Sequence, residues 1–165
     1  MKKITILLFS TFLFQSCIFL AAPIAKNQAN KNLTTEKNAI PPDLGKDDTY
    51  VVCVLEERES RDQYLKKYFK ENYKGKYVFA TMDEINSEKY GDVDVYRYAF
   101  TYNKIQHTVS DMETNDKVAS YGSSNYFIYD RKMKKEYNST FHSGFFGKTI
   151  EAYTKNMEKQ RLANK

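Results

Sequence analysis

The chain has 165 residues and a formal net charge of +5, which leaves room for one folded domain and a short leader. Once Lys2 and Lys3 are set aside with the leader, the 26 basic residues fall to 24, against 21 acidic residues. This mixed balance lacks the clustered basic surface that nucleic-acid binding needs, so we expect no nucleic-acid partner.

Residues 1–25 have the composition of an export signal. Lys2 and Lys3 form a basic start, and no charged residue lies between Ile4 and Ala25. A basic start followed by an apolar run is typical of a signal peptide rather than of a folded helix. We therefore expect the rest of the chain to be exported from the cytoplasm.

The processing of this leader leaves three alternatives. Ser16-Cys17 resembles the end of a lipobox, and in that case Cys17 carries lipid and becomes the first residue. Cleavage by an ordinary signal peptidase after Ala25, or near Ala22, instead gives a soluble periplasmic or secreted protein. In the third alternative the segment is not cleaved and attaches the protein to the membrane through its N-terminus, although its polar residues make it a mediocre span.

Residues 26–48 are expected to form a flexible linker. They are polar, contain Pro41, Pro42 and Gly45, and show no sustained apolar period. A tether of roughly 20 residues would let a surface-anchored domain stand off a membrane.

The residues 49–163 are predicted to form a single α+β domain. The predicted elements, in chain order, are a strand at 49–57, a helix from Ser60 to Gly75, a strand at 76–81, a short helix from Thr81 to about Lys89, a strand at 93–104, some strand character within 106–117, strands at 118–122, 125–130 and 135–141, and a helix after Gly147. The strands after residue 92 are sequential, which favours antiparallel pairing.

Both long helices show one apolar stripe at helical spacing. The stripes consist of Tyr64, Leu65, Tyr68 and Phe69 in the first helix, and of Phe146, Ile150, Tyr153 and Met157 in the second. Ser60 with Gln63, and Thr81 with Glu84, match the capping-box pattern. Because each stripe needs a sheet face to cover, we expect a two-layer α+β sandwich: a mainly antiparallel sheet of about five or six strands covered by two amphipathic helices.

An aromatic stripe is the most distinctive feature of the predicted strand at 93–104. Strict alternation places Tyr96, Tyr98, Phe100 and Tyr102 on one face. This face is either the core beneath the helices or an exposed platform, because tyrosine suits wet interfaces with sugars, peptides or proteins. Arg97 falls on the opposite face, and a charged residue is rarely buried unless it is paired, so that face is expected to be the outer one.

No catalytic, metal or cofactor motif stands out in the sequence. Cys53 lies in an apolar run and is expected to be a buried core residue. His107, Ser110 and Asp111 are closer in sequence than the members of a triad usually are, and with His142 they show no metal-ligand spacing. We expect neither a cofactor nor a metal.

The sequence therefore predicts an exported bacterial envelope protein that acts by binding, as a non-catalytic binding or accessory domain tethered to or near a membrane. Its expected partner is a protein or a glycan of the cell envelope. The alternative is an exported hydrolase with an unrecognised histidine and carboxylate site. That enzyme would hold His107 or His142 in a concave pocket together with an acidic residue of shifted pKa.

Overall fold

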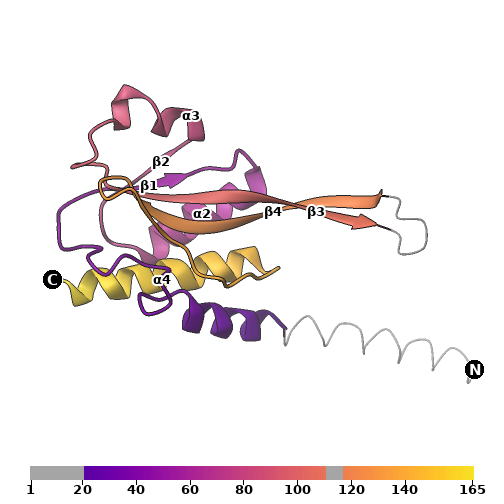
Figure 1. Cartoon of the computed structure of the whole chain (residues 1–165). Coiled ribbons are helices and arrows are strands. Elements are labelled where there is room, and N and C mark those ends of the chain that lie inside the picture. The colour runs from indigo at the N-terminus through magenta and orange to yellow at the C-terminus, as the bar shows by residue number, and fades with distance from the viewer. Residues whose placement is uncertain (1–20, 111–116) are drawn as a thin grey trace, which may run out of the picture.

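The computed structural model describes residues 21–110 and 117–165, without the side chains of 105–110 and 117–123. Five strands form one open sheet in the order β2-β1-β3-β4-β5 (Figure 1). The strands are β1 (Val51–Val54), β2 (Tyr77–Ala80), β3 (Tyr98–Ser110), β4 (Lys117–Asp130) and β5 (Lys135–Tyr137). The helices are α2 (Glu59–Asn72), α3 (Met82–Ile85), the 3-10 turn η1 (Glu88–Tyr90) and α4 (Phe146–Ala163), and a further helix occupies residues 21–32. The predicted α+β class is confirmed.

The sheet is mixed, which corrects the expectation of a mainly antiparallel one. β3, β4 and β5 pair antiparallel in sequence order, as predicted. β1 instead pairs in parallel with both β2 and β3. The crossover through α2 brings β2 back parallel to β1, and the connection through α3 and η1 does the same for β3, as parallel pairs require.

The larger core lies between one sheet face and the helices α2 and α4, which pack side by side beneath it (Figure 1). Leu65 and Phe69 of α2 and Ile150, Tyr153 and Met157 of α4 are fully buried there. The predicted apolar stripes are thus confirmed as the core faces of these two helices, except at Tyr64, which is 45% exposed. A smaller cluster on the opposite sheet face is closed by α3 and η1, so that face is partly covered as well.

Residues 21–48 form a strap along α4, and the predicted flexible linker at 26–48 is wrong. Leu33, Ile40 and Leu44 are at most 3% exposed and belong to the larger core. The domain therefore includes residues that lie before the predicted boundary at 49, because the groove beside α4 would otherwise expose its apolar floor.

Amide side chains of α4 hold the strap by its backbone. Asn156 donates to the carbonyl oxygen of Leu33 at 2.7 Å, Gln160 to that of Pro42 at 2.7 Å, and Asn164 to that of Leu44 at 2.9 Å. The three amides are spaced by four residues and so lie on one helix face. They satisfy backbone carbonyls that no regular element pairs, which fixes an otherwise irregular segment.

Several element boundaries differ from the sequence prediction. The capping box of Thr81 and Glu84 is confirmed, but α2 begins after Arg58, and its N-cap has no side-chain hydrogen bond. β3 begins at Tyr98, because residues 93–96 form a turn that Asp92 stabilises by accepting from the amide of Asp94. The segments predicted as separate strands at 118–122 and 125–130 form the single strand β4.

Arg97 joins the strap to the sheet and is 7% exposed, contrary to its expected outer position. Its guanidinium donates to Asp130 at 2.8 and 3.1 Å and to Asp47 at 2.9 Å, and it also pairs with Asp43. Asp130 is fully buried and also accepts from the amide of Met133, which fixes the β4–β5 turn. Burial of this charge is tolerated because three carboxylates compensate it.

Gly45 allows the strap to pass close to α4, and Gly45→Ala should lower the free energy of unfolding by about 1–3 kcal/mol. Gly45 has φ of +91°, and an added Cβ would lie 2.8 Å from Arg161 Cα. Gly144→Ala is the matched control, because a Cβ there has no atom within 4 Å, and its effect should stay within about 0.5 kcal/mol. Urea unfolding of both variants checks this, and equal effects would contradict the tight contact.

Glu151 makes the attachment of the strap sensitive to pH. Burial raises the pKa of this carboxyl, but hydrogen bonds from Lys26 and Lys155 outweigh burial and lower its pKa to about 2. Between that value and the ordinary 4.5, the unfolded chain binds more protons than the folded one, so stability falls as the pH drops through this window. The contribution of Glu151 is at most about 3 kcal/mol.

Glu151→Gln should therefore flatten the loss of stability between pH 5 and pH 2, measured by urea unfolding at a series of pH values. Glu71→Gln, at an exposed position of α2, is the control and should leave the pH dependence unchanged. Identical pH profiles for Glu151→Gln and the wild type would refute the assignment.

Candidate functional site

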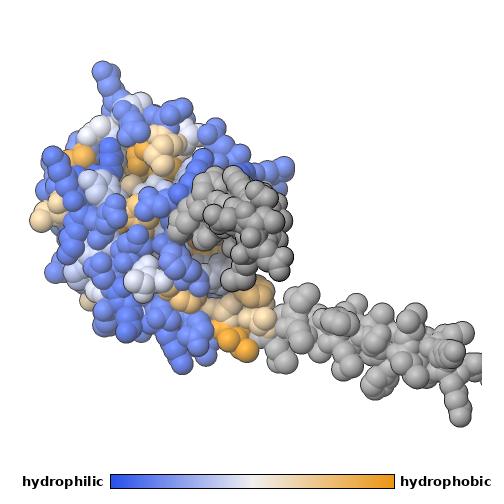
Figure 2. All heavy atoms as spheres, turned by 45° about the vertical axis from the view of Figure 1, so that its right-hand side comes forward, coloured by the Kyte–Doolittle hydropathy of each residue, from blue (hydrophilic) through white to orange (hydrophobic). Residues whose placement is uncertain are grey.

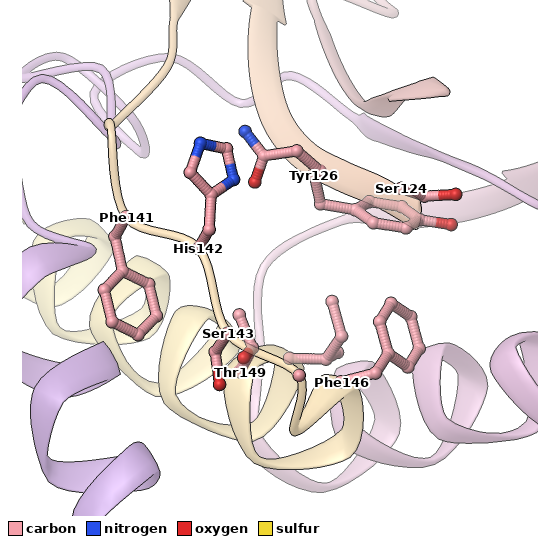
Figure 3. Close-up of a pocket in the computed structure, with 10 residues that line it drawn as sticks. Ser124, Tyr126, Phe141, His142, Ser143, Phe146 and Thr149 are labelled. Carbon is pink, nitrogen blue, oxygen red and sulfur yellow. The ribbon is translucent and has the colours of Figure 1, made fainter. Parts of the chain in front are cut away.

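The candidate site is a hollow of about 280 Å³ between β4, the loop 138–145 and the first turns of α4 (Figure 3). It is lined by Ser124, Asn125, Tyr126, Phe141, His142, Ser143, Gly144, Phe146, Thr149 and Ile150. His142 and Phe146 stand on opposite sides of the hollow, and Tyr126 lies across it from Thr149. The hollow thus combines aromatic rings with uncharged polar groups.

A second hollow of about 330 Å³ adjoins the first and shares Asn125 and His142 with it. Its lining is formed by Asn103, Asn125, Asn138, Ser139, Thr140 and His142. The two hollows share lining residues and are together called the amide groove, which extends from the first turns of α4 past Ser124–Tyr126 of β4 to the loop that follows β5. Together they lie within the range of about 300–1,000 Å³ typical of small-ligand sites.

Short side-chain to backbone hydrogen bonds shape the loop that forms one wall of the amide groove. Ser139 Oγ accepts from the amide of Phe141 at 2.9 Å, and Ser143 Oγ accepts from the amide of Phe145 at 3.1 Å. Thr149 Oγ1 donates to the carbonyl oxygen of Phe145 at 3.1 Å, which ties the loop to α4. Turns of this kind use the hydroxyl oxygen as acceptor and leave its hydrogen available.

Tyr126 forms the floor of the amide groove and is fixed from below. Its hydroxyl donates to the carbonyl oxygen of Val54 at 3.2 Å, and its ring stacks on Phe100 with centroids 5.0 Å apart. Burial, followed by the nearby negative charge of Glu56, raises the pKa of Tyr126 well above its ordinary value. The phenol therefore stays neutral and serves as a rigid wall rather than as an acid or base.

A charged pair lies behind this floor and does not line the groove. Glu56 is 5% exposed, accepts from Ser124 Oγ at 2.9 Å and pairs with Arg61 at 3.3 Å. Arg61 in turn lies over the ring of Phe146, 4.5 Å from its centroid. Glu56 thus orients the Ser124 hydroxyl and Arg61 contacts the Phe146 ring, while the two charges compensate each other.

The structure places the predicted aromatic stripe mostly in the core. Tyr98 and Phe100 are 1% and 0% exposed and face the helices, so an exposed platform is wrong for these two residues. Tyr102 is half-buried and packs against both clusters, while Tyr96 lies in the turn before β3 and packs against η1. Two helices need this sheet face, and the aromatic rings supply the apolar area.

The remaining sequence candidates are dispersed. Cys17 and Asp111 lie outside the described residues, as do the side chains of His107 and Ser110. The backbone of His107 is four residues, or about 13 Å, beyond Asn103 along β3. Cys53 is fully buried, and burial raises the pKa of its thiol, which makes it an inert core residue.

No three metal-binding side chains converge anywhere in the described part of the chain. The helices described at 21–32 and from 59 onward include none long and apolar enough to cross a bilayer.

Among the described side chains, His142 is the one histidine at the site, and no carboxylate lines the groove around it.

The amide groove was not predicted from the sequence. The available signal is the composition of residues 138–144, where Asn138, Ser139, Thr140, His142 and Ser143 fall within seven positions. We expected a strand up to 141, whereas β5 ends at Tyr137 and leaves this polar segment as a loop. Short polar side chains such as these form hydrogen bonds with backbone groups that an irregular segment would otherwise leave unpaired.

Comparison of the chain with protein-family models, with curated proteins and with solved structures gives no match.

Proposed function

We propose that this chain is an exported envelope protein that acts by binding, and that its ligand occupies the amide groove. The observation that carries the proposal is the lining of the groove. Aromatic rings from β4, α4 and the loop 138–145 surround amide and hydroxyl groups that are held in place by hydrogen bonds. Preorganised polar groups within apolar walls are the general features of a ligand site.

The alternative function, an exported hydrolase, rests on His142, which is exposed at the groove. A histidine base usually needs a nucleophile within hydrogen-bond reach and a third group that orients it. Ser143 Oγ is engaged with the amide of Phe145, and no carboxylate lines the groove beside His142. These contacts favour binding over turnover.

The strap supports a location close to a membrane surface. The described helix is already formed at Ala21, only four residues after Cys17, and four extended residues span at most about 14 Å. A lipid on Cys17 would therefore hold the domain against the bilayer rather than at the end of a long tether. Figure 2 shows apolar atoms gathered where the described chain begins, and Ile24 is 60% exposed.

The test is retention of the purified protein on envelope material isolated from the cells that produce it. Wild-type protein should be retained, and both His142→Ala and Asn138→Ala should reduce retention at least tenfold while keeping the unfolding midpoint. Gln63→Ala, on the exposed side of α2, is the matched control and should be retained like the wild type. Equal retention of all variants would refute the groove as the site. Turnover of envelope material that is lost in His142→Ala would establish the hydrolase instead.

A further inference from the structure

We infer that the amide groove binds an uncharged oligosaccharide, an inference that rests on the proposed binding function and names its ligand class. The observations are a lining without carboxylates, lysines or arginines, the amides and hydroxyls in it, and the aromatic rings beside them.

The composition of the lining disfavours charged ligands. None of the residues that line either hollow is an aspartate, glutamate, lysine or arginine. Behind Ser124 and Phe146, Glu56 and Arg61 pair with each other, and the Glu56 side chain is fully buried. A cationic ligand would lose hydration on entering the groove without gaining a carboxylate partner, and an anionic ligand would find neither lysine nor arginine in the lining.

The polar groups match a ligand whose groups both donate and accept. Asn125 Nδ2 donates to Asn138 Oδ1 at 3.1 Å, which holds the two amides of the lining side by side. Ser139 and Ser143 each accept from a backbone amide, which leaves their hydroxyl hydrogens to donate. A sugar hydroxyl can accept from one such group and donate to another at once.

The aromatic side chains of the groove suit the apolar faces of a sugar ring. Phe141 and Phe146 are half-buried, so each keeps part of its ring at the groove, while Tyr126 closes the floor. The C–H faces of a sugar ring are apolar, and they gain from contact with an aromatic face as other apolar surfaces do. The groove sets side-chain amides and hydroxyls beside aromatic rings, which matches the mixed polar and apolar surface of a sugar.

The test titrates full-length protein with tri-N-acetylchitotriose and maltotriose as neutral probes, and with the deacetylated glucosamine trimer as a cationic probe of the same length. Binding is followed by two-dimensional amide NMR. We expect at least one neutral trimer to shift the amide signals of 138–146, and to bind at least tenfold more tightly than the cationic trimer. His142→Ala and Asn138→Ala should weaken that binding at least tenfold, and Gln63→Ala should not change it.

Absence of shifts with both neutral trimers at millimolar concentration would overturn the inference, as would tighter binding of the cationic trimer or unchanged affinity in both groove variants. The envelope-retention experiment distinguishes a failure of the ligand class from a failure of the binding function. Groove-dependent retention without binding of a neutral sugar would overturn only the ligand class. Loss of both would overturn the binding function itself.

Discussion

A chain that begins at Gly45, without the strap residues before it, should not fold cooperatively. The deletion removes Leu33, Ile40 and Leu44 from the larger core, each worth about 1.5–3 kcal/mol of burial. Their sum, roughly 5–9 kcal/mol, is comparable to the whole stability of a typical domain, about 5–15 kcal/mol. The deletion also leaves the apolar groove beside α4 open to water. Circular dichroism and urea unfolding measure the result.

Point variants make the same prediction testable if the short chain is insoluble. Ile40→Ala should lower the free energy of unfolding by about 2–5 kcal/mol, because it leaves a cavity in the core. Ile24→Ala is the control, since Ile24 is 60% exposed on the same segment, and its effect should stay within about 0.5 kcal/mol. A fully stable protein without residues 1–44 would show that this segment is a linker after all.

Arg97→Met should lower the free energy of unfolding by about 3–5 kcal/mol, because it removes one partner of a buried ion pair. Asp130 is fully buried, and without Arg97 its charge would have no compensation among its described contacts. The strap would also lose the contacts of Asp43 and Asp47 with the guanidinium. Urea unfolding at pH 7 gives the value.

Two further variants isolate the cause of that loss. Lys132→Met removes an exposed ion pair with Asp94 and should cost less than about 1 kcal/mol. Adding Asp130→Asn to Arg97→Met removes the uncompensated charge and should recover part of the stability, as a coupled pair does in a double-mutant cycle. If Arg97→Met were no more destabilising than Lys132→Met, the buried pair would not hold the strap.

The helices that show a clear hydrophobic periodicity were predicted correctly. α2 and α4 follow from one apolar stripe each, and the capping box at Thr81 follows from two residues. The parallel pairing of β1 does not follow, because the short apolar run Val51–Val54 reads the same in a parallel or an antiparallel sheet. Pairing direction is decided by the crossovers through α2 and through α3 and η1, which are properties of the whole fold.

The strap was missed because it is stabilised by a partner distant in sequence. Its apolar residues Leu33, Ile40 and Leu44 show no helical or strand period, and Pro41 breaks any regular element. Composition alone therefore indicates a linker. A signal does exist in α4, where Asn156, Gln160 and Asn164 follow at intervals of four, but the backbone they bind lies more than 100 residues away.

The candidate site was only partly predictable for a related reason. Alternation correctly placed Tyr98 and Phe100 on one face, but the same alternation does not say whether a face is covered by helices. The amide groove depends on where β5 ends and on how two serines cap the loop that follows. These local hydrogen bonds cannot be predicted from the pattern of hydrophobic residues.

The measurement that tests the account most directly is the intact mass of the protein isolated from the cells that produce it, with its cell fraction recorded. The account predicts an exported protein: a mass that begins at Cys17 with added acyl chains in the membrane fraction, a mass that begins near Lys26 outside the cytoplasm, or the full-length mass in the membrane fraction. A full-length, unmodified mass in the soluble cytoplasmic fraction would contradict it.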